Sequence, residues 1–294
     1  MAVVELVQRN KKLFCVLALF TVAAFWGSGF PITKIVLESG IKPNAMLSMR
    51  FMGAFALMYA FLKVKGIEIT KEEIKVGLIA GTILFTAFCT QTVGAVYTTA
   101  SKSAFITGAN VVMVPFVYWI MSKEKPKVIV YFTSVLCFTG IGLLSLEKDV
   151  SINYGDMLTL ACAFFYAFHM VVVGLNMKKC NPLVINCFQM LSAGILGVIG
   201  NLTVESGSLI GSSFTNMQIM AMAVLVVFNT FFCYLIQTFV QKYVPPSRVS
   251  LILSTEILFG AIFSVLLMGD LITLKIAAGG LLIFISIIIA EMKS

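Results

Sequence analysis

A glutamate, an arginine and a histidine lie inside apolar stretches of this 294-residue chain, where an ionised group is costly. Glu256 stands near the middle of one stretch, Arg50 lies within another, and His169 is the only histidine. A carboxylate in such surroundings needs a cavity or a partner. Glu256 is therefore predicted to bind a proton or a cationic part of a small molecule. The alternative is a structural acid that accepts hydrogen bonds.

Arg50 and His169 each allow two interpretations. The Arg50 guanidinium could clamp a carboxylate or neutralise Glu256, or it could extend along its helix to the outer interface. His169 could relay protons with Glu256 or be a satisfied buried imidazole. It cannot form a metal site alone, and the seven cysteines show no CxxC or other metal-like spacing. We therefore expect no metal and no cofactor.

The elements that must position these residues are membrane-spanning helices. The mean hydropathy is +1.01 and charged residues make up 12% of the chain, about half the usual share in a soluble domain. The net charge of +8 resides in short loops, which argues against a nucleic-acid partner and for an effect on topology. About 20 apolar residues cross a bilayer. Ten spans are predicted, at about residues 13–37, 44–62, 75–96, 101–121, 127–146, 155–176, 182–202, 217–240, 247–268 and 272–291.

An internal repeat relates the stretch from Phe85 to Ile106 to the stretch from Phe231 to Ile252 without a gap. The polar residues Gln91, Thr92, Tyr97 and Ser101 match Gln237, Thr238, Tyr243 and Ser247. A repeat of this size constrains the whole fold. The same register pairs Lys102 with Arg248, which we interpret as interfacial anchors or gate charges, and Glu124 with Asp270, which we interpret as solvated end charges.

The loop charges predict how the spans are oriented. Roughly fifteen Lys and Arg residues fall on one side of the predicted membrane and about five on the other, which places both termini in the cytoplasm. Each half has an odd number of spans, so the second half enters from the opposite face. The predicted fold is all-α and integral to the membrane, with ten transmembrane helices arranged as two inverted five-helix repeats, residues 1–148 and 149–294.

Inverted repeats around a site at the bilayer midplane are typical of secondary transporters. The repeat aligns Glu256 with Asn110, which cannot titrate, and Trp26 with Tyr166, an aromatic pair that would flank a pocket or simply pack between helices. The Gly and Pro residues after Trp26 are predicted to interrupt the first span. The candidate residues of a transport path are Trp26, Ser28, Arg50, Gln91, Asn110, Tyr166, His169, Asn229, Tyr234, Gln237 and Glu256.

The chain resembles the EamA-like branch of the drug/metabolite transporter superfamily over nearly its whole length. The resemblance is carried by a WGS-type signature in the first span, by the repeated Gln-Thr…Tyr…Ser-basic stretch and by Ser254-Thr255-Glu256 in the ninth span. Ile257 stands where the family commonly has Pro, and Asp270 where it often has Glu. The resemblance implies movement of small metabolites, often amino acids, without a covalent cofactor.

We therefore expect a secondary transporter that exports amino acids or similar small metabolites across the cell membrane by alternating access, with Glu256 as the candidate for proton coupling. Arg50 together with Glu256 would suit a zwitterion. Export of lipophilic drugs or nucleotide-type metabolites is the alternative substrate class. A membrane-embedded enzyme ranks lower because HExxH and GxSxG motifs are missing. A channel ranks lower because an inverted repeat favours alternating access. The expected partners are a small-molecule substrate and the lipid of a bacterial inner membrane.

Overall fold

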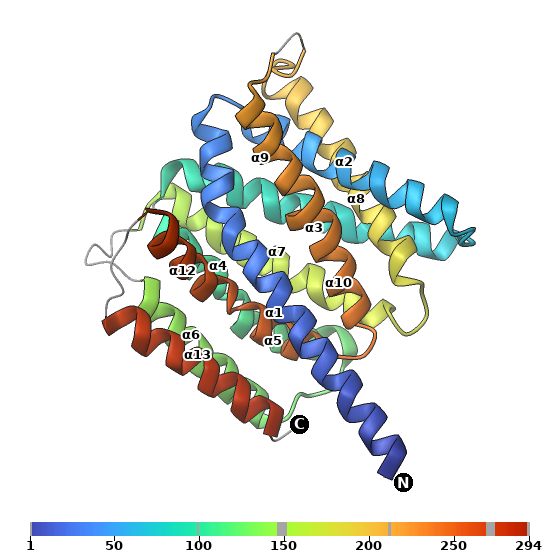
Figure 1. The fold of residues 1–294 in the computed structure, drawn as a ribbon, viewed down its shortest axis with the longest axis vertical. Helices are drawn as coiled ribbons and strands as arrows, with labels where there is room; N and C mark the ends of the chain where they lie inside the picture. The colour runs from blue at the N-terminus through green and yellow to red at the C-terminus, as the bar shows by residue number, and fades with distance from the viewer. Residues whose placement is uncertain (1, 99, 146–151, 211–212, 269–273, 293–294) are drawn as a thin grey trace.

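The computed structural model describes residues 2–98, 100–145, 152–210, 213–268 and 274–292, and every regular element within these ranges is a helix (Figure 1). The elements are α1 (Ala2–Glu38), α2 (Pro43–Val64), α3 (Lys71–Tyr97), α4 (Ala100–Gly108), α5 (Asn110–Ser122), α6 (Val128–Ser145), α7 (Tyr154–Asn176), α8 (Pro182–Thr203), α9 (Asn216–Val226), the π-helix η1 (Val227–Phe232), α10 (Cys233–Val240), α11 (Pro246–Leu253), α12 (Glu256–Met268) and α13 (Leu274–Met292). Asp270 and Lys148 lie outside the described residues.

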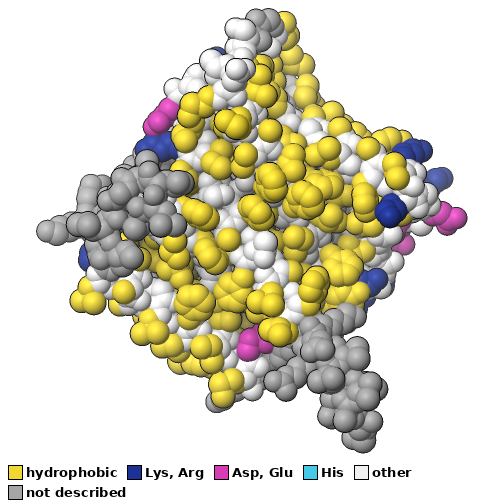
Figure 2. All heavy atoms as spheres, viewed as in Figure 1, with side chains coloured by type: hydrophobic (Ala, Val, Ile, Leu, Met, Phe, Trp, Pro, Cys, Tyr) yellow, Lys and Arg dark blue, Asp and Glu magenta, His cyan; other side chains and the backbone are white. Residues whose placement is uncertain are grey.

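The helices have the length and composition of membrane spans. Nine helical segments in the described ranges are long and apolar enough to cross a bilayer, and the segment Val128–Leu144 within α6 is a shorter apolar helix. Figure 2 shows hydrophobic side chains over most of the face in view, with few charged side chains, most of them near its margins. The prediction of an all-α, multi-pass membrane protein is confirmed.

The pair α2–α8 packs closely because three glycines of α8 face α2. A Cβ atom at Gly194, Gly197 or Gly200 would lie 2.6 to 2.8 Å from atoms of Met52, Ser48 and Asn44, respectively. Glycines let helix backbones approach each other where lipid supplies no hydrophobic driving force for association. The spacing of three residues keeps all three glycines on one side of α8, so the contact continues along the helix.

The other close contacts join helices that are far apart in the sequence. α3 packs against both α7 and α8, and α1 packs along α12. α6 and α13 form a pair at one edge of the bundle (Figure 1), where a Cβ at Gly140 would lie 2.7 Å from the carbonyl oxygen of Gly279. Each of these contacts joins the first half of the chain to the second, so neither half forms a separate bundle.

Two spans are broken at matching places. α5 begins at Asn110 after α4 ends, and α12 begins at Glu256, 146 residues later, after α11 ends. At both breaks the backbone tightens to an i→i−3 hydrogen bond: the Ala109 amide donates to the Ile106 carbonyl over 3.1 Å, and the Thr255 amide donates to Ile252 over 3.1 Å. The second break forms although Ile257 replaces the common Pro. The Thr255 hydroxyl also donates to the Ile252 carbonyl over 2.7 Å and so competes with the regular helix.

Buried acids join the two halves near the ends of the bundle. Glu205, which is 7% exposed, accepts hydrogen bonds from the backbone amides of Asn44 and Ala45 at the start of α2, over 2.7 and 2.9 Å. It thus supplies the cap that the N-cap residue of α2, Lys42, does not provide. Glu73 in the first turn of α3 accepts from the Asn181 amide over 2.8 Å, just before α8 begins.

The predicted interruption of the first span is wrong. α1 is continuous from Ala2 to Glu38 and includes Pro31. The glycines serve packing instead: a Cβ at Gly27 would lie 2.7 Å from the carbonyl oxygen of Glu256, so α12 can approach α1 only because that Cβ is missing. The Ser28 hydroxyl donates to the Phe25 carbonyl over 2.7 Å, within the same helix.

Candidate functional site

The candidate site is built around the π-helical turn η1. A π turn leaves backbone carbonyls without the regular i→i−4 partner, and such turns are frequent at functional sites. Here the Thr230 hydroxyl donates to the Leu225 carbonyl, five residues earlier, over 2.7 Å. Asn229 and Thr230 are almost completely buried, at 1% and 0% exposure. The turn therefore presents a carbonyl and a hydroxyl oxygen inside the bundle.

Arg50 on α2 binds to both of these oxygens. Its Nε donates to Thr230 Oγ1 over 2.5 Å, and its Nη2 donates to the Asn229 carbonyl over 3.3 Å. The guanidinium carbon lies 4.6 Å from the centre of the Phe88 ring on α3. Arg50 is only 5% exposed, so it does not extend to the outer interface. Its contacts in the described part of the chain are neutral, and no ion pair joins it to Glu256.

Trp26 and Asn229 lock α1 against η1. The Trp26 indole donates to the Asn229 carbonyl over 2.8 Å, so that carbonyl serves both Trp26 and Arg50. The Asn229 side-chain amide donates back to the Phe25 carbonyl over 2.5 Å. A Cβ at Gly29 would lie 2.5 Å from that amide nitrogen. The WGSG signature therefore has a local function: Trp26 binds η1, and Gly29 makes room for it.

Aromatic rings surround the guanidinium. Trp26 packs on Tyr234 with centroids 5.2 Å apart, and Phe88 packs edge-on against Tyr166 at 5.4 Å and near Tyr234 at 6.3 Å. The sequence pairs Trp26 with Tyr166, but the structure gives them different partners, with Phe88 and Tyr234 between them. All four rings belong to, or pack against, one buried cluster that includes Phe51.

A second polar chain leads from Tyr166 to the first broken span. The Tyr166 hydroxyl donates to Gln91 Oε1 over 3.0 Å, and Gln91 Nε2 donates to Thr107 Oγ1 over 3.4 Å. Thr107 lies in the last turn of α4, and Asn110, which is half-buried, opens α5. The hydrogen bonds thus connect the ring cluster to the α4–α5 break through residues of three helices.

Glu256 is the first residue of α12. It is half-buried, and its charge acts electrostatically on Tyr166 and Tyr234, as does the charge of Arg50. Among the residues that the structure describes, no side chain or amide donates a hydrogen bond to the Glu256 carboxylate. An arginine and a titratable acid therefore both lie within electrostatic reach of the two tyrosines, and no described residue forms an ion pair with either of them.

The remaining candidate residues lie outside this arrangement. His169 binds Gln189 Oε1 through Nε2 over 2.9 Å, and Gln189 in turn donates to Asn186 over 2.6 Å. His169 does contact the Tyr234 ring edge, at 6.1 Å between centroids, but it has no contact with Glu256. This corresponds to the satisfied imidazole, not to the relay. Gln237 is buried on α10, three residues after Tyr234, and Ser28 bonds only within α1.

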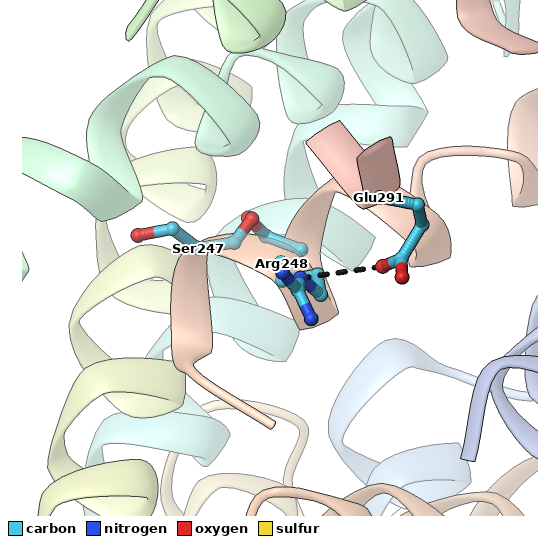
Figure 3. Close-up of polar contacts among 4 residues, drawn as sticks. Ser247, Arg248 and Glu291 are labelled. Carbon is cyan, nitrogen blue, oxygen red and sulfur yellow. Dashed lines mark hydrogen bonds and ion pairs between the residues drawn. The ribbon is translucent and has the colours of Figure 1, made fainter. Parts of the chain in front are cut away.

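The gate-charge candidate Arg248 lies away from the cluster. Arg248 Nε on α11 is 3.2 Å from Glu291 Oε1 on α13, with the two side chains 18% and 23% exposed (Figure 3). A surface hollow in the described residues lies where Gln218 on α9 donates to Ser39 after α1, and its lining does not include Arg50. Neither feature contacts Arg50. Within the described ranges, no three His, Cys, Asp or Glu side chains gather as a metal site requires.

Sequence reasoning missed two members of the site. Thr230 follows the predicted Asn229 directly and is the closer partner of Arg50, but a buried threonine in a span resembles any other packing residue. Phe88 is one of 25 phenylalanines in the chain and carries no mark of its position over the guanidinium. The buried arginine itself was the available signal, because it requires acceptors in a neighbouring helix.

Comparisons with known proteins agree on a transporter family. The family model described as the EamA-like transporter family matches residues 13–146 and again residues 153–292. The chain is 30% identical over 283 residues to a protein of Archaeoglobus fulgidus named an uncharacterized transporter. The aligned region covers 96% of this chain and 87% of that protein. A solved structure described as "Crystal structure of protein" superposes with a TM-score of 0.79 at 12% identity, covering 95% of this chain and 99% of the other. That likeness concerns the fold alone.

Proposed function

Since the chain belongs to the EamA-like transporter family, and is a transporter rather than an enzyme, we propose that it exports amino acids or similar small zwitterions across the cell membrane. The observation that carries this proposal is the buried Arg50, which has no acidic partner among the described residues. A guanidinium held in a low-dielectric interior attracts a carboxylate strongly, and an unpaired one is costly. A substrate carboxylate would relieve that cost.

Glu256 supplies the second half of the recognition. Its carboxylate is half-buried, acts electrostatically on Tyr166 and Tyr234, and accepts no hydrogen bond from the described residues. It can bind the ammonium group of a zwitterion or, when the site is empty, a proton. Competition between these two cations for one carboxylate would couple export to proton entry.

Alternating access by two inverted repeats, residues 1–148 and 149–294, with both termini cytoplasmic, is the transport mechanism that we propose. It is supported by the two separate family matches and by the equivalent breaks before Asn110 and Glu256. The buried acids Glu73 and Glu205 link the halves near the ends of the bundle. Rocking of the halves requires such links to open in turn.

The test compares the spent medium of cells that make the unchanged protein with that of cells that make Glu256→Gln at equal expression. A compound enriched only with the unchanged protein identifies the substrate and supports Glu256 as the coupling residue. Enrichment by both proteins keeps the exporter and assigns Glu256 a structural role. Enrichment by neither contradicts export and directs the search to uptake, a channel or another class.

Purified protein in liposomes then tests the zwitterion. Saturable counterflow of an amino acid supports a carrier, because a channel does not exchange substrate in this way. Arg50→Lys should reduce counterflow about tenfold or more, since an ammonium cannot reproduce a bidentate contact. Arg248→Lys is the matched control, because its ion pair with Glu291 is partly exposed and worth little. Lack of movement of every amino acid by protein of verified fold would contradict the proposal.

A further inference from the structure

The hydrogen-bond donors of Arg50 are divided between two edges of the guanidinium. Thr230 Oγ1 and the Asn229 carbonyl, in consecutive residues of η1, accept from Nε and Nη2. These two nitrogens form one edge of the planar group. The second edge, formed by Nη1 and the other Nη2 hydrogen, has no acceptor among the described residues. The side chain is nevertheless 95% removed from solvent, at 5% exposure.

The acceptor on the occupied edge is itself fixed. Thr230 Oγ1 can accept from Arg50 only while its own hydrogen points elsewhere, and it donates that hydrogen to the Leu225 carbonyl over 2.7 Å. The π turn brings that carbonyl, five residues back, into reach of the hydroxyl. The backbone of η1 thus sets the direction of the Thr230 lone pair, and the lone pair sets the plane of the guanidinium.

Phe88 fixes the same plane from its face. The ring lies 4.6 Å below the guanidinium carbon and is itself held edge-on by Phe51 and Tyr166, at 5.2 and 5.4 Å. A cation over an aromatic face is attracted by the ring and gains from being desolvated. The guanidinium is therefore held along one edge and one face, which leaves one edge for a ligand.

We propose that Thr230 and Phe88 are positioning residues that aim the Nη1–Nη2 edge of Arg50 at a substrate carboxylate, which binds end-on through both oxygens. The inference rests on the proposed function, because it concerns the same site. A planar carboxylate matches two parallel N–H donors in spacing and charge. The substrate class is accordingly one with a free α-carboxylate, and the corresponding amide should not be bound.

Trp26 supplies a reporter inside the site. It donates to the same Asn229 carbonyl as Arg50, and the chain has one other tryptophan, Trp119, which is 39% exposed on α5. A Trp119→Phe parent leaves Trp26 as the single indole. Its fluorescence is titrated in detergent with each L-amino acid, and then with the amide of every amino acid that gives a saturable response.

Two matched pairs of variants are made in this parent. Thr230→Val removes the acceptor and keeps the shape, whereas Thr230→Ser keeps the hydroxyl. Phe88→Leu removes the ring face, whereas Phe88→Tyr keeps it. We expect Thr230→Val to raise Kd about tenfold or more, as for loss of a hydrogen bond to a charged group. Phe88→Leu should raise Kd about threefold to tenfold, while Thr230→Ser and Phe88→Tyr stay within about twofold of the parent.

The outcomes distinguish failure of the positioning inference from failure of the proposed function. A parent that responds to no amino acid overturns the proposed zwitterion site. A parent that responds equally to acid and amide overturns the carboxylate contact. If the parent prefers the acid but Thr230→Val and Phe88→Leu bind as tightly as it does, the positioning inference fails and the proposed function stands. A variant that is poorly positioned but folded should show a raised Kd with the same fluorescence change at saturation, whereas a damaged fold should reduce that change. If Thr230→Val does not fold, the comparison of Phe88→Leu with Phe88→Tyr decides.

Discussion

The two broken spans share a backbone hydrogen bond at the break and differ in their chemistry. The α4–α5 break and the α11–α12 break share the i→i−3 hydrogen bond at Ala109 and Thr255, and each second helix begins one residue later. The first break presents the neutral amide of Asn110, and the second presents the carboxylate of Glu256. Both repeats thus contain a similar turn, but only the turn before Glu256 is followed by a side chain that can ionise.

The surroundings of the two breaks differ as well. Gly27 brings α1 onto the backbone of Glu256, whereas a Cβ at Gly108, before the first break, would lie 3.0 Å from side-chain carbons of Ile141 and Ile257. The second break is therefore seated against rigid backbone, and the first is seated against side chains. The comparison teaches that similar backbone turns can carry different side-chain chemistry, since only the second break holds an acid.

The largest effect is expected from Glu256→Gln. This change keeps the shape of the side chain and removes the charge, so transport driven by a proton gradient should fall by about tenfold or more. The remaining transport should lose its pH dependence. Uptake into liposomes at several external pH values measures both. Normal transport with normal pH dependence would show that the two breaks do not differ in function.

Moving the acid to the other break should not restore transport. The double variant Asn110→Glu, Glu256→Asn places one carboxylate in the equivalent turn. Tyr166 and Tyr234, on which the Glu256 charge acts, stay where they are. We expect the loss to equal that of Glu256→Asn alone, measured in the same liposome assay. Recovery to a substantial fraction of the original rate would mean that either break can hold the coupling acid.

Gly27→Ala tests the rigid seat of the second break. The added Cβ would lie 2.7 Å from the Glu256 carbonyl oxygen and 2.8 Å from the Gly260 nitrogen, both of which are backbone atoms. We expect a destabilisation of about 1–3 kcal/mol, which exceeds the gain in helix propensity from Gly to Ala. Gly260→Ala is the matched control on the facing helix, because its nearest contact is 3.6 Å. Melting temperatures in detergent compare them, and equal values would argue against a tight seat.

The smallest effect is expected from Gly108→Ala at the first break. Its new Cβ would lie 3.0 Å from side-chain carbons of Ile141 and Ile257, which need to shift by only a few tenths of an ångström. A change of less than about 1 kcal/mol is expected, with transport close to normal. A destabilisation as large as that of Gly27→Ala would show that both breaks are seated alike. The same melting experiment measures it.

The site residues that could be predicted from the sequence are those whose polar or charged side chains are costly to bury in a membrane. Arg50, Glu256 and Asn229 stand out among apolar neighbours, and the structure places Arg50 and Asn229 in contact. The repeat register predicted that Asn110 and Glu256 correspond, and helices begin at both. These predictions succeeded for polar residues, because a polar side chain in an apolar environment can find hydrogen-bond partners in few positions.

The failures concern residues whose role depends on geometry. The glycines after Trp26 were expected to interrupt α1, but they allow close packing against α12 and η1. The prediction failed because a glycine in a sequence is compatible both with close helix packing and with a break in the helix. The absence of Pro at Ile257 did not prevent the break, because the Thr255 side chain competes for the backbone. The role of Phe88 could not be predicted, because it depends on the position of the Arg50 guanidinium over its ring.

The turn between α7 and α8 offers a chemical label that reports on motion. Cys180 lies there, 6% exposed, next to Asn181, whose amide donates to Glu73. Burial, with the nearby acids Glu72 and Glu73, raises the pKa of the Cys180 thiol above its usual value. The closed protein should therefore react slowly with a maleimide at this thiol. If the proposed rocking opens the Glu73 link, Cys180 should gain water and react faster, so the labelling rate of this native thiol would report the opening of that end.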